Sequence, residues 1–170
     1  MKQRRLQLSQ TAADVAAYIL QKRGPMTAWK LQKLVFYSWA WSLVWYDQLL
    51  FMEPVEAWEN GPVVRELYML HRGQRTVQNV TGNPAAILDT RAIDRVLVAY
   101  GGWSPQELRD TAHEEEPYGK ARNKGRNTII TAASARRYYG RRWDRIQRER
   151  AKDEAEWKEL IDATTNTSNK

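Results

Sequence analysis

Residues 27–45 read TAWKLQKLVFYSWAWSLVW and form the most apolar helical pattern of the chain. Thr27 is a residue type that caps helix starts, and the side chains after it recur at steps of three and four residues. One side of the expected helix carries Leu31, Leu34, Val35, Ser38, Trp41 or Ser42, and Trp45, and the opposite side carries Trp29, Lys33, Tyr37, Ala40 and Val44. Because a helix that is apolar nearly all round is central to its domain, we expect other elements to surround it.

Helix signals occur on both sides of this stretch. Thr11 with Asp14 predicts a helix start, and the apolar spacing that follows stops at Gly24-Pro25. Ser104-Pro105-Gln106-Glu107 combines a serine cap, a proline at the first helical position and a glutamate at the third, which is the clearest start signal in the chain. Further helices are expected over 62–71 with Pro62 in the first turn, over 93–100 closing at Gly101-Gly102, and over 131–143.

The helical pattern is interrupted at residues 50–59. Val55 and Ala57 alternate with Glu56 before Asn60-Gly61-Pro62, which favours a short strand or ribbon. Residues 74–89 are interpreted as a loop. The chain of 170 residues is long enough for one core, so we predict a mainly α fold: a compact single-domain helical bundle with a short β ribbon around residues 50–59. Its parts are an N-terminal arm (1–10), a helical domain (11–143), and a charged C-terminal helix with a disordered tail (144–170).

Composition argues against most catalytic and cofactor chemistry. The chain has no cysteine, which excludes disulfides, thiolate metal sites and cysteine nucleophiles. Only His71 and His113 are histidines, and His113-Glu114-Glu115-Glu116 lacks the paired ligands four residues apart that a zinc protease helix carries. No phosphate-binding glycine loop occurs. We therefore expect no enzyme and no metal or cofactor, and the lack of an apolar run of eighteen residues or a signal peptide predicts a cytoplasmic protein away from membranes.

Positive charge is concentrated late in the chain. Residues 119–150 contain eleven Lys or Arg against Asp144 and Glu149 alone. Such a stretch attracts nucleic acid phosphates or an acidic protein surface, and it also fits an ordinary solvated helical face. No zinc-finger, RRM or basic-zipper motif accompanies it. A basic nucleic-acid-binding regulatory module, acting weakly through residues 120–150, is therefore the alternative to a protein-binding function.

Three segments together resemble the Panacea antitoxin domain, the family of SocA-like proteins often encoded beside phage or mobile-element toxin genes. They are MTAWKLQKLVFYSWAW (26–41), FMEPVEAWENGPVV (51–64) followed by Leu67-Tyr68, and LRDTAHEEEPY (108–118) followed by Ala121-Arg122. Their order and spacing match the family pattern, and the resemblance extends from about Thr11 to Tyr139. Ala112 and Tyr118 depart from it, because the family usually has threonine and tryptophan there.

This resemblance implies an antitoxin that binds a cognate protein toxin and inhibits it directly, or delivers it to a protease. The partner toxins of the family are unrelated to one another, so the sequence does not name the target. A homo-oligomer is also compatible with these residues. The motif and partner-binding candidates are Lys30, Lys33, Tyr37, Trp41, Trp58, Gly61, Pro62, Val63, His113, Glu116, Pro117, Tyr118, Arg122, Arg136 and Arg137.

Some of these candidates have an equally simple structural interpretation. Lys30, Lys33, Tyr37 and Trp41 follow steps of three or four residues, so they can share a helix face. There the lysines would pair with internal carboxylates and Trp41 would pack in the core. Trp58 and Tyr68 are likewise expected in the core, and Gly61-Pro62 is expected to set a tight turn into a helix. His113 belongs either to a buried polar network or to a partner contact.

Overall fold

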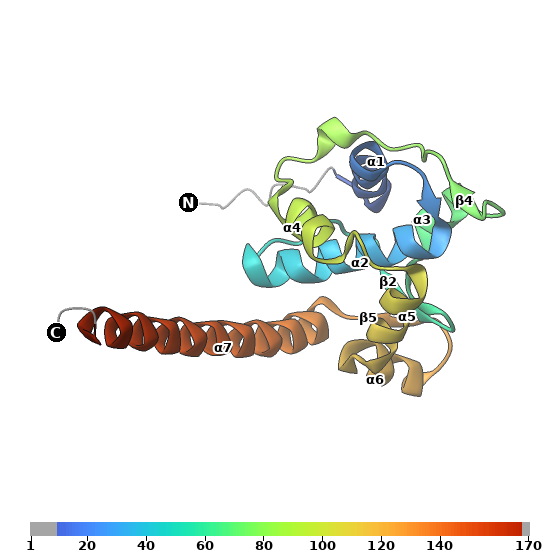
Figure 1. Cartoon of the computed structure of the whole chain (residues 1–170). Coiled ribbons are helices and arrows are strands. Elements are labelled where there is room, and N and C mark those ends of the chain that lie inside the picture. Colours follow the sequence, from blue (N-terminus) through green and yellow to red (C-terminus); the bar gives the residue numbers. More distant parts are fainter. Residues whose placement is uncertain (1–9, 168–170) are drawn as a thin grey trace, which may run out of the picture.

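The computed structural model describes residues 10–167, and its centre is the helix α2 (Ala28–Trp45) (Figure 1). Every residue from Leu31 to Leu43 is buried. The helices α1 (Ala12–Arg23), α4 (Arg91–Tyr100), α5 (Pro105–Glu114) and α7 (Ala132–Thr167) pack against it. The predictions of a central apolar helix and of a mainly α fold are thus confirmed.

The helix starts follow the capping signals of the sequence. Thr11 and Asp14 form a reciprocal capping box at α1, and Ser104 and Glu107 form another at α5. The Thr27 hydroxyl accepts a hydrogen bond from the backbone N–H of Lys30. These side chains satisfy N–H groups that have no partner within the helix, and so fix where each helix begins.

The expected β ribbon is present and is larger than predicted. Strands β2 (Val55–Trp58) and β3 (Gly61–Val64) form an antiparallel hairpin, and β5 (Thr128–Ile130) pairs with the other edge of β2. Glu59 and Asn60 form the turn, because Trp58 pairs with Gly61. A second pair joins β1 (Met26–Thr27) to β4 (Thr76–Val77). The hairpin lies below α2 in Figure 1.

The prediction that Pro62 lies in the first turn of a helix is wrong. Pro62 and Val63 belong to β3, and the helix α3 (Arg65–His71) begins only after Val64. The side chain of Gln32 on α2 holds this strand end: its Oε1 accepts from the N–H of Val64 at 2.9 Å, and its Nε2 donates to the carbonyl of Val64 at 3.3 Å. Pairing with β2 and with the Gln32 amide thus outweighs the helix-start signal of proline.

Two other segments differ from the sequence prediction. The loop 74–89 contains the short β4 and the 3₁₀ turn η1 (Pro84–Ala86). The helix α6 (Glu116–Lys124) was not predicted, because its charged residues have little apolar periodicity. Glu115 separates it from α5 in an extended backbone conformation.

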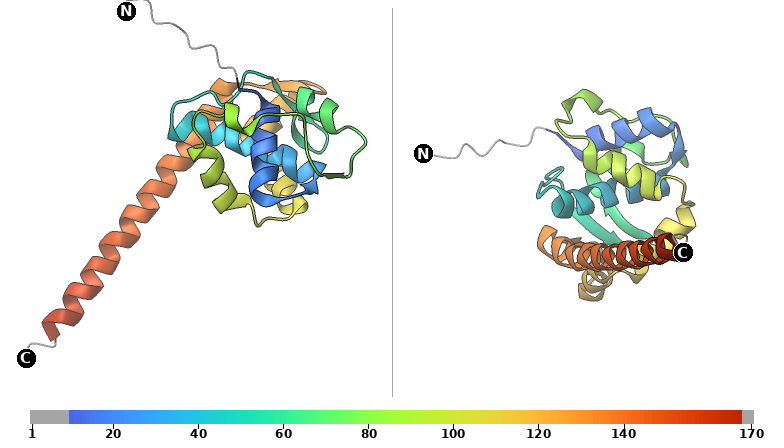
Figure 2. Two further views of the ribbon diagram at one scale, coloured as in Figure 1. Left: turned by 90° about the horizontal axis from the view of Figure 1, so that it is seen from above. Right: turned by 60° about the vertical axis from the view of Figure 1, so that its left-hand side comes forward.

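The last helix crosses the expected domain boundary without a break. Helix α7 has 36 residues, so it is about 54 Å long, and it runs through residue 144 to Thr167. The helix thus includes residues 164–167 of the predicted tail, while 168–170 and the arm over 1–9 lie outside the described residues. All side chains described from 144 to 162 are exposed. Figure 2 shows this outer half of α7 projecting away from the body.

Candidate functional site

Lys33 lies at the centre of the motif residues, where α2 faces the β2–β3 hairpin. The side chain is 0% exposed, and its Nζ donates a hydrogen bond of 3.0 Å to the carbonyl oxygen of Pro62. The ring centroid of Trp29 lies 5.5 Å from the same Nζ. Because burial removes the ammonium from water, it lowers the pKa of Lys33 from 10.5 to about 7. Lys33 therefore acts as a buried link between the helix and the hairpin.

Gly61 makes room for that link. Its φ is +104°, in the region that favours glycine, and a Cβ at this position would lie 2.5 Å from Cε of Lys33. The tight turn itself is formed by Glu59 and Asn60, so the predicted role of Gly61-Pro62 as a turn into a helix is corrected. Gly61 instead admits the lysine, and Pro62 supplies its acceptor.

His113 and Tyr118 close the same hairpin from α5 and α6. The Tyr118 hydroxyl donates to the carbonyl oxygens of Trp58 and Glu59, at 2.8 and 3.2 Å. The exposed His113 ring stacks on the Tyr118 ring at 4.6 Å with an interplanar angle of 11°. Partial burial lowers the pKa of His113, and the positive charge of Lys33 lowers it further. His113 is thus available to a partner and does not belong to a buried network.

Glu115, which the sequence analysis did not single out, is the acceptor of a buried polar network. Its Oε2 accepts from the hydroxyls of Tyr37 at 3.1 Å and Tyr139 at 2.5 Å, and its Oε1 accepts from Arg142 at 2.8 Å. The side chain is 3% exposed, and burial raises the pKa of its carboxyl. The network joins α2 and α7 through the junction of α5 and α6. The motif segment 108–118 contains Glu115 among three consecutive glutamates. Which of the three points inward depends on the junction between α5 and α6, which the sequence analysis did not predict.

The remaining α2 candidates also bind groups inside the protein. Lys30 Nζ donates to the carbonyl oxygen of Gly101 at 2.8 Å. Lys30 and Lys33 therefore both bind backbone carbonyl groups and do not pair with the internal carboxylates that the sequence analysis expected. Trp41 is 2% exposed, which confirms its core position, and its Nε1 donates to the hydroxyl of Tyr100 at 3.1 Å. The Tyr37 ring stacks on Tyr100 at a centroid distance of 4.5 Å. These four residues use their polar groups for structure.

The other candidates divide between the interior and the surface. Val63 and Pro117 are buried, whereas Trp58 is only half-buried and packs edge-on against the half-buried Tyr68 at 4.9 Å. The prediction that Trp58 and Tyr68 are core residues is therefore wrong. Arg122 is half-buried, and Arg136 and Arg137 are exposed.

The described residues show no arrangement for metal chemistry or membrane crossing. Among them, no three His, Asp or Glu side chains are grouped closely enough to hold a metal ion. Across the same part of the chain, no helix combines the length and the apolar character that a bilayer requires.

A family model described as "Antitoxin SocA-like, Panacea domain" matches residues 31–118, slightly more than half of the chain. The chain belongs to the SocA-like Panacea antitoxin family. The Panacea match begins in α2 at Leu31 and ends in α6 at Tyr118, so it includes the Lys33 site, the hairpin and Glu115. Comparisons with curated proteins and with solved structures found no match.

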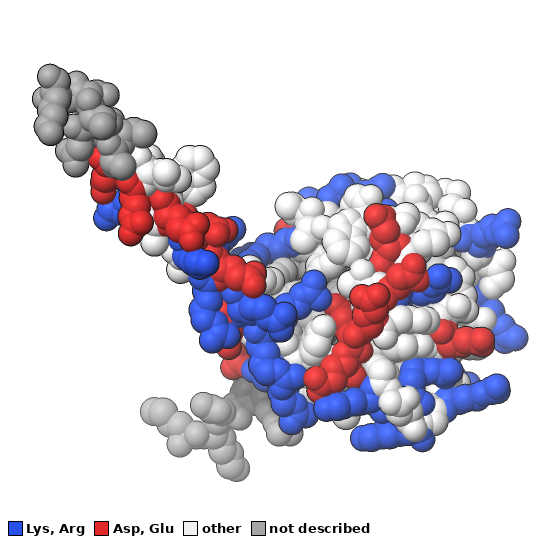
Figure 3. Space-filling view, turned by 60° about the horizontal axis from the view of Figure 1, so that its bottom comes forward, with Lys and Arg blue, Asp and Glu red and all other residues white. Residues whose placement is uncertain are grey.

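Outside the Panacea match, the first half of α7 presents cations to solvent. Figure 3 shows Lys and Arg side chains gathered on the inner half of α7 and Asp and Glu side chains on its outer half. Part of this charge is neutralised, because Arg136 pairs with Asp47, and Glu116 pairs with both Lys120 and Arg141. Between residues 119 and 150, the exposed or half-buried cations that form no ion pair within the described residues are Arg122, Lys124, Arg126, Arg137, Arg145, Arg148 and Arg150; we call them the basic surface.

Proposed function

We propose that this Panacea-domain protein is an antitoxin that neutralises a cognate protein toxin by binding it directly. The observation that carries the proposal is the family match over residues 31–118. Most motif residues in that span bind one another inside the fold: Lys33 links α2 to the hairpin, Tyr37 binds Glu115, and Tyr118 holds the hairpin turn. The motif therefore stabilises a scaffold, and the exposed surface of that scaffold meets the toxin.

The basic surface is our candidate for this contact. It combines exposed arginines on α7, such as Arg137, with cations at the end of α6, such as Lys124. An acidic patch on the toxin would be attracted to it and would associate faster at low ionic strength. Arginine also suits interfaces because its planar guanidinium binds carboxylates with two parallel hydrogen bonds.

A protein partner fits this surface better than a nucleic acid does. Glu116 lies between Lys120 and Arg141, and acidic side chains of α5 such as Asp110 and Glu114 are exposed nearby in the chain. Figure 3 shows acidic side chains next to the cations on this face. Carboxylates among the cations repel the phosphates of a nucleic acid. The affinity of a protein for a nucleic acid increases with the number of phosphates that its cations neutralise. On a protein partner, they can instead pair with complementary cations.

The experiment is co-expression of the chain with the protein encoded next to it, read out as growth rescue and co-purification. Direct neutralisation predicts rescue with a stable complex and an unchanged toxin level. Rescue with loss of the toxin would assign delivery to a protease instead. The absence of both rescue and complex would overturn the proposal, and binding of a labelled duplex by the purified chain would then favour the nucleic-acid alternative.

Charge-reversal variants locate the contact within that experiment. Arg137→Glu combined with Arg145→Glu changes two exposed cations of α7. The matched control is Arg65→Glu, at the exposed first position of α3, where α3 and α7 lie on different sides of the body (Figure 1). Loss of rescue in the α7 variant alone supports the basic surface, and equal rescue by all three chains would exclude it.

A further inference from the structure

A repeating pattern runs along α7 outside the family match, and of its residues only Arg150 also belongs to the basic surface. Trp143, Ile146, Arg150, Asp153, Trp157 and Leu160 follow one another at alternating steps of three and four residues; we call them the α7 seam. This is the a and d spacing of a helix that pairs with another helix. Trp157 is 67% exposed and Leu160 is 58% exposed, on a part of α7 that projects beyond the body. Large apolar side chains so placed mark an interaction face.

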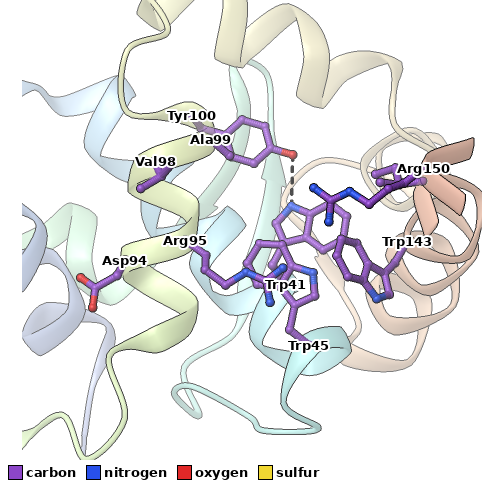
Figure 4. A pocket seen from close by; sticks show the side chains of 10 residues that line it. Trp41, Trp45, Asp94, Arg95, Val98, Ala99, Tyr100, Trp143 and Arg150 are labelled. Atoms are coloured by element: carbon purple, nitrogen blue, oxygen red, sulfur yellow. Dashed lines mark hydrogen bonds between the residues drawn. The ribbon is translucent and has the colours of Figure 1, made fainter. Parts of the chain in front are cut away.

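The inner end of the seam lines a groove on the body. A cavity of about 540 Å³ lies between α2, α4 and α7, where Trp45, Arg95, Val98, Trp143 and Ile146 form much of its wall (Figure 4). Val98 is 84% exposed, and the guanidinium of Arg95 lies 3.9 Å from the ring centroid of Trp45. The groove thus offers aromatic and aliphatic surface with a cation at its rim, which suits a large aromatic side chain.

We propose that two copies of this chain pair through antiparallel α7 helices, so that the outer half of each helix enters the groove of the other. The symmetry of the seam carries this inference. With a two-fold axis between residues 151 and 152, Ile146 lies opposite Trp157 of the second copy, and Trp143 lies opposite Leu160. In the same register, Arg150 lies opposite Asp153. The two charged positions of the seam therefore meet each other, and the four apolar positions also meet each other.

The charge along α7 selects the antiparallel orientation. Residues 136–152 contain eight Lys or Arg against Asp144 and Glu149, whereas residues 153–162 contain five Asp or Glu against Lys158. In an antiparallel pair, the basic half of each helix lies beside the acidic half of the other helix. A parallel pair would place like charges together over the whole length, which destabilises it.

A second copy also fits the groove by position. The overlapping seam from Trp143 to Leu160 has 18 residues, about 27 Å of helix, and its register places Trp157 of the second copy at the level of Ile146, which lines the groove. Pairing would cover the exposed indole of Trp157 and the exposed Val98 in one contact. This inference does not depend on the antitoxin function, since a chain without a toxin partner would still pair.

Light scattering after size exclusion tests the pairing on the purified full chain. We expect twice the chain mass for the wild type at high concentration, and the mass of one chain for Trp157→Glu. The matched control is Leu88→Glu, which also replaces an exposed apolar residue, 85% exposed, by glutamate away from α7 and should leave the dimer intact. A monomeric wild type at every concentration, or a dimeric Trp157→Glu variant, would overturn the proposal.

Disulfide crosslinking tests the orientation, because the natural chain has no cysteine. We expect a mixture of Ile146→Cys and Trp157→Cys chains to form the mixed disulfide on mild oxidation, and each variant alone to remain largely uncrosslinked. A crosslink between two Ile146→Cys chains without the mixed product would exclude the antiparallel register.

Discussion

The ammonium nitrogen of Lys33 lies 3.0 Å from the carbonyl oxygen of Pro62, and this hydrogen bond crosses from the central helix to the hairpin. The lysine is fully buried, and no carboxylate within the described residues forms an ion pair with it. A buried cation with a neutral acceptor costs stability whenever it is protonated. The stability of this fold should therefore depend on pH through Lys33.

We predict that the wild type becomes more stable relative to Lys33→Met as the pH rises from 7 to 9. The pKa of Lys33 is about 7 in the folded chain and 10.5 as its ordinary value. Between these values the unfolded chain binds more protons, so the free energy of unfolding increases with pH, by about 2 kcal/mol over this interval. Urea unfolding of both chains at several pH values measures it. Parallel pH curves for the two chains would show that the buried ammonium keeps its ordinary pKa.

We predict that Gly61→Ala destabilises the fold more than Gly73→Ala does. Both glycines have positive φ, at +104° and +83°, so alanine is strained at both. At Gly61 the new Cβ would also lie 2.5 Å from Cε of Lys33, whereas nothing lies within 4 Å at Gly73. We expect about 1 kcal/mol for Gly73→Ala and at least about 2 kcal/mol for Gly61→Ala, measured by urea unfolding. Equal losses would mean that the lysine side chain yields without cost.

We predict that Glu115→Ala costs about 3 kcal/mol of unfolding free energy, because it leaves the hydroxyls of Tyr37 and Tyr139 and the guanidinium of Arg142 without their acceptor. Arg142 is partly exposed, which keeps the loss at the lower end for buried pairs. The exposed Glu114→Ala is the matched control and should change the free energy by less than about 0.5 kcal/mol.

We predict a pH signature for the same carboxyl. The pKa of Glu115 is raised above its ordinary value of 4.5 by burial, so the folded chain holds more protons than the unfolded chain just above that pH. The free energy of unfolding of the wild type should then fall relative to that of Glu115→Gln as the pH rises from 4.5 through the folded pKa. An increase over that range would show that Arg142 and the two hydroxyls outweigh burial.

Features of this fold that depend on neighbouring residues are predictable from the sequence, whereas features that depend on tertiary contacts are not. Caps such as Thr11 and Ser104 are local hydrogen bonds between residues three apart, so the sequence places those helix starts correctly. Gly61 and Pro62 carry a local signal for a turn and a helix, but the strand that forms there depends on pairing with β2 and with Gln32, 32 residues before Val64. A sequence pattern over a few residues does not identify partners that are distant in the chain.

The candidate site shows the same division. The motif identifies Lys33, Tyr37 and Tyr118 as special, and all three make hydrogen bonds over more than 25 residues of sequence. Their bonding inside the fold is not predictable from spacing, since it requires the hairpin and the α5–α6 junction. Glu115 was missed for that reason: its neighbour Glu116 is chemically identical but binds Lys120 at the surface.

We predict that Arg137→Glu slows association with the protein partner and weakens the dependence of that rate on salt. Arg137 is exposed and forms no ion pair within the described part of the chain, so its charge is available for long-range attraction. Removing a cation at the rim of an interface lowers the association rate while the dissociation rate changes little. At low salt we expect the association rate to decrease about threefold or more, which corresponds to an energy on the order of 0.7 kcal/mol. The decrease should disappear near 0.5 M salt, because the Debye length is then only about 4 Å.

The matched control Arg65→Glu makes the same charge change on α3 and should leave the association rate within about twofold. Surface plasmon resonance with the co-purified partner at several salt concentrations measures both rates, and a loss that persists at high salt would mean that Arg137 makes a direct contact in the complex.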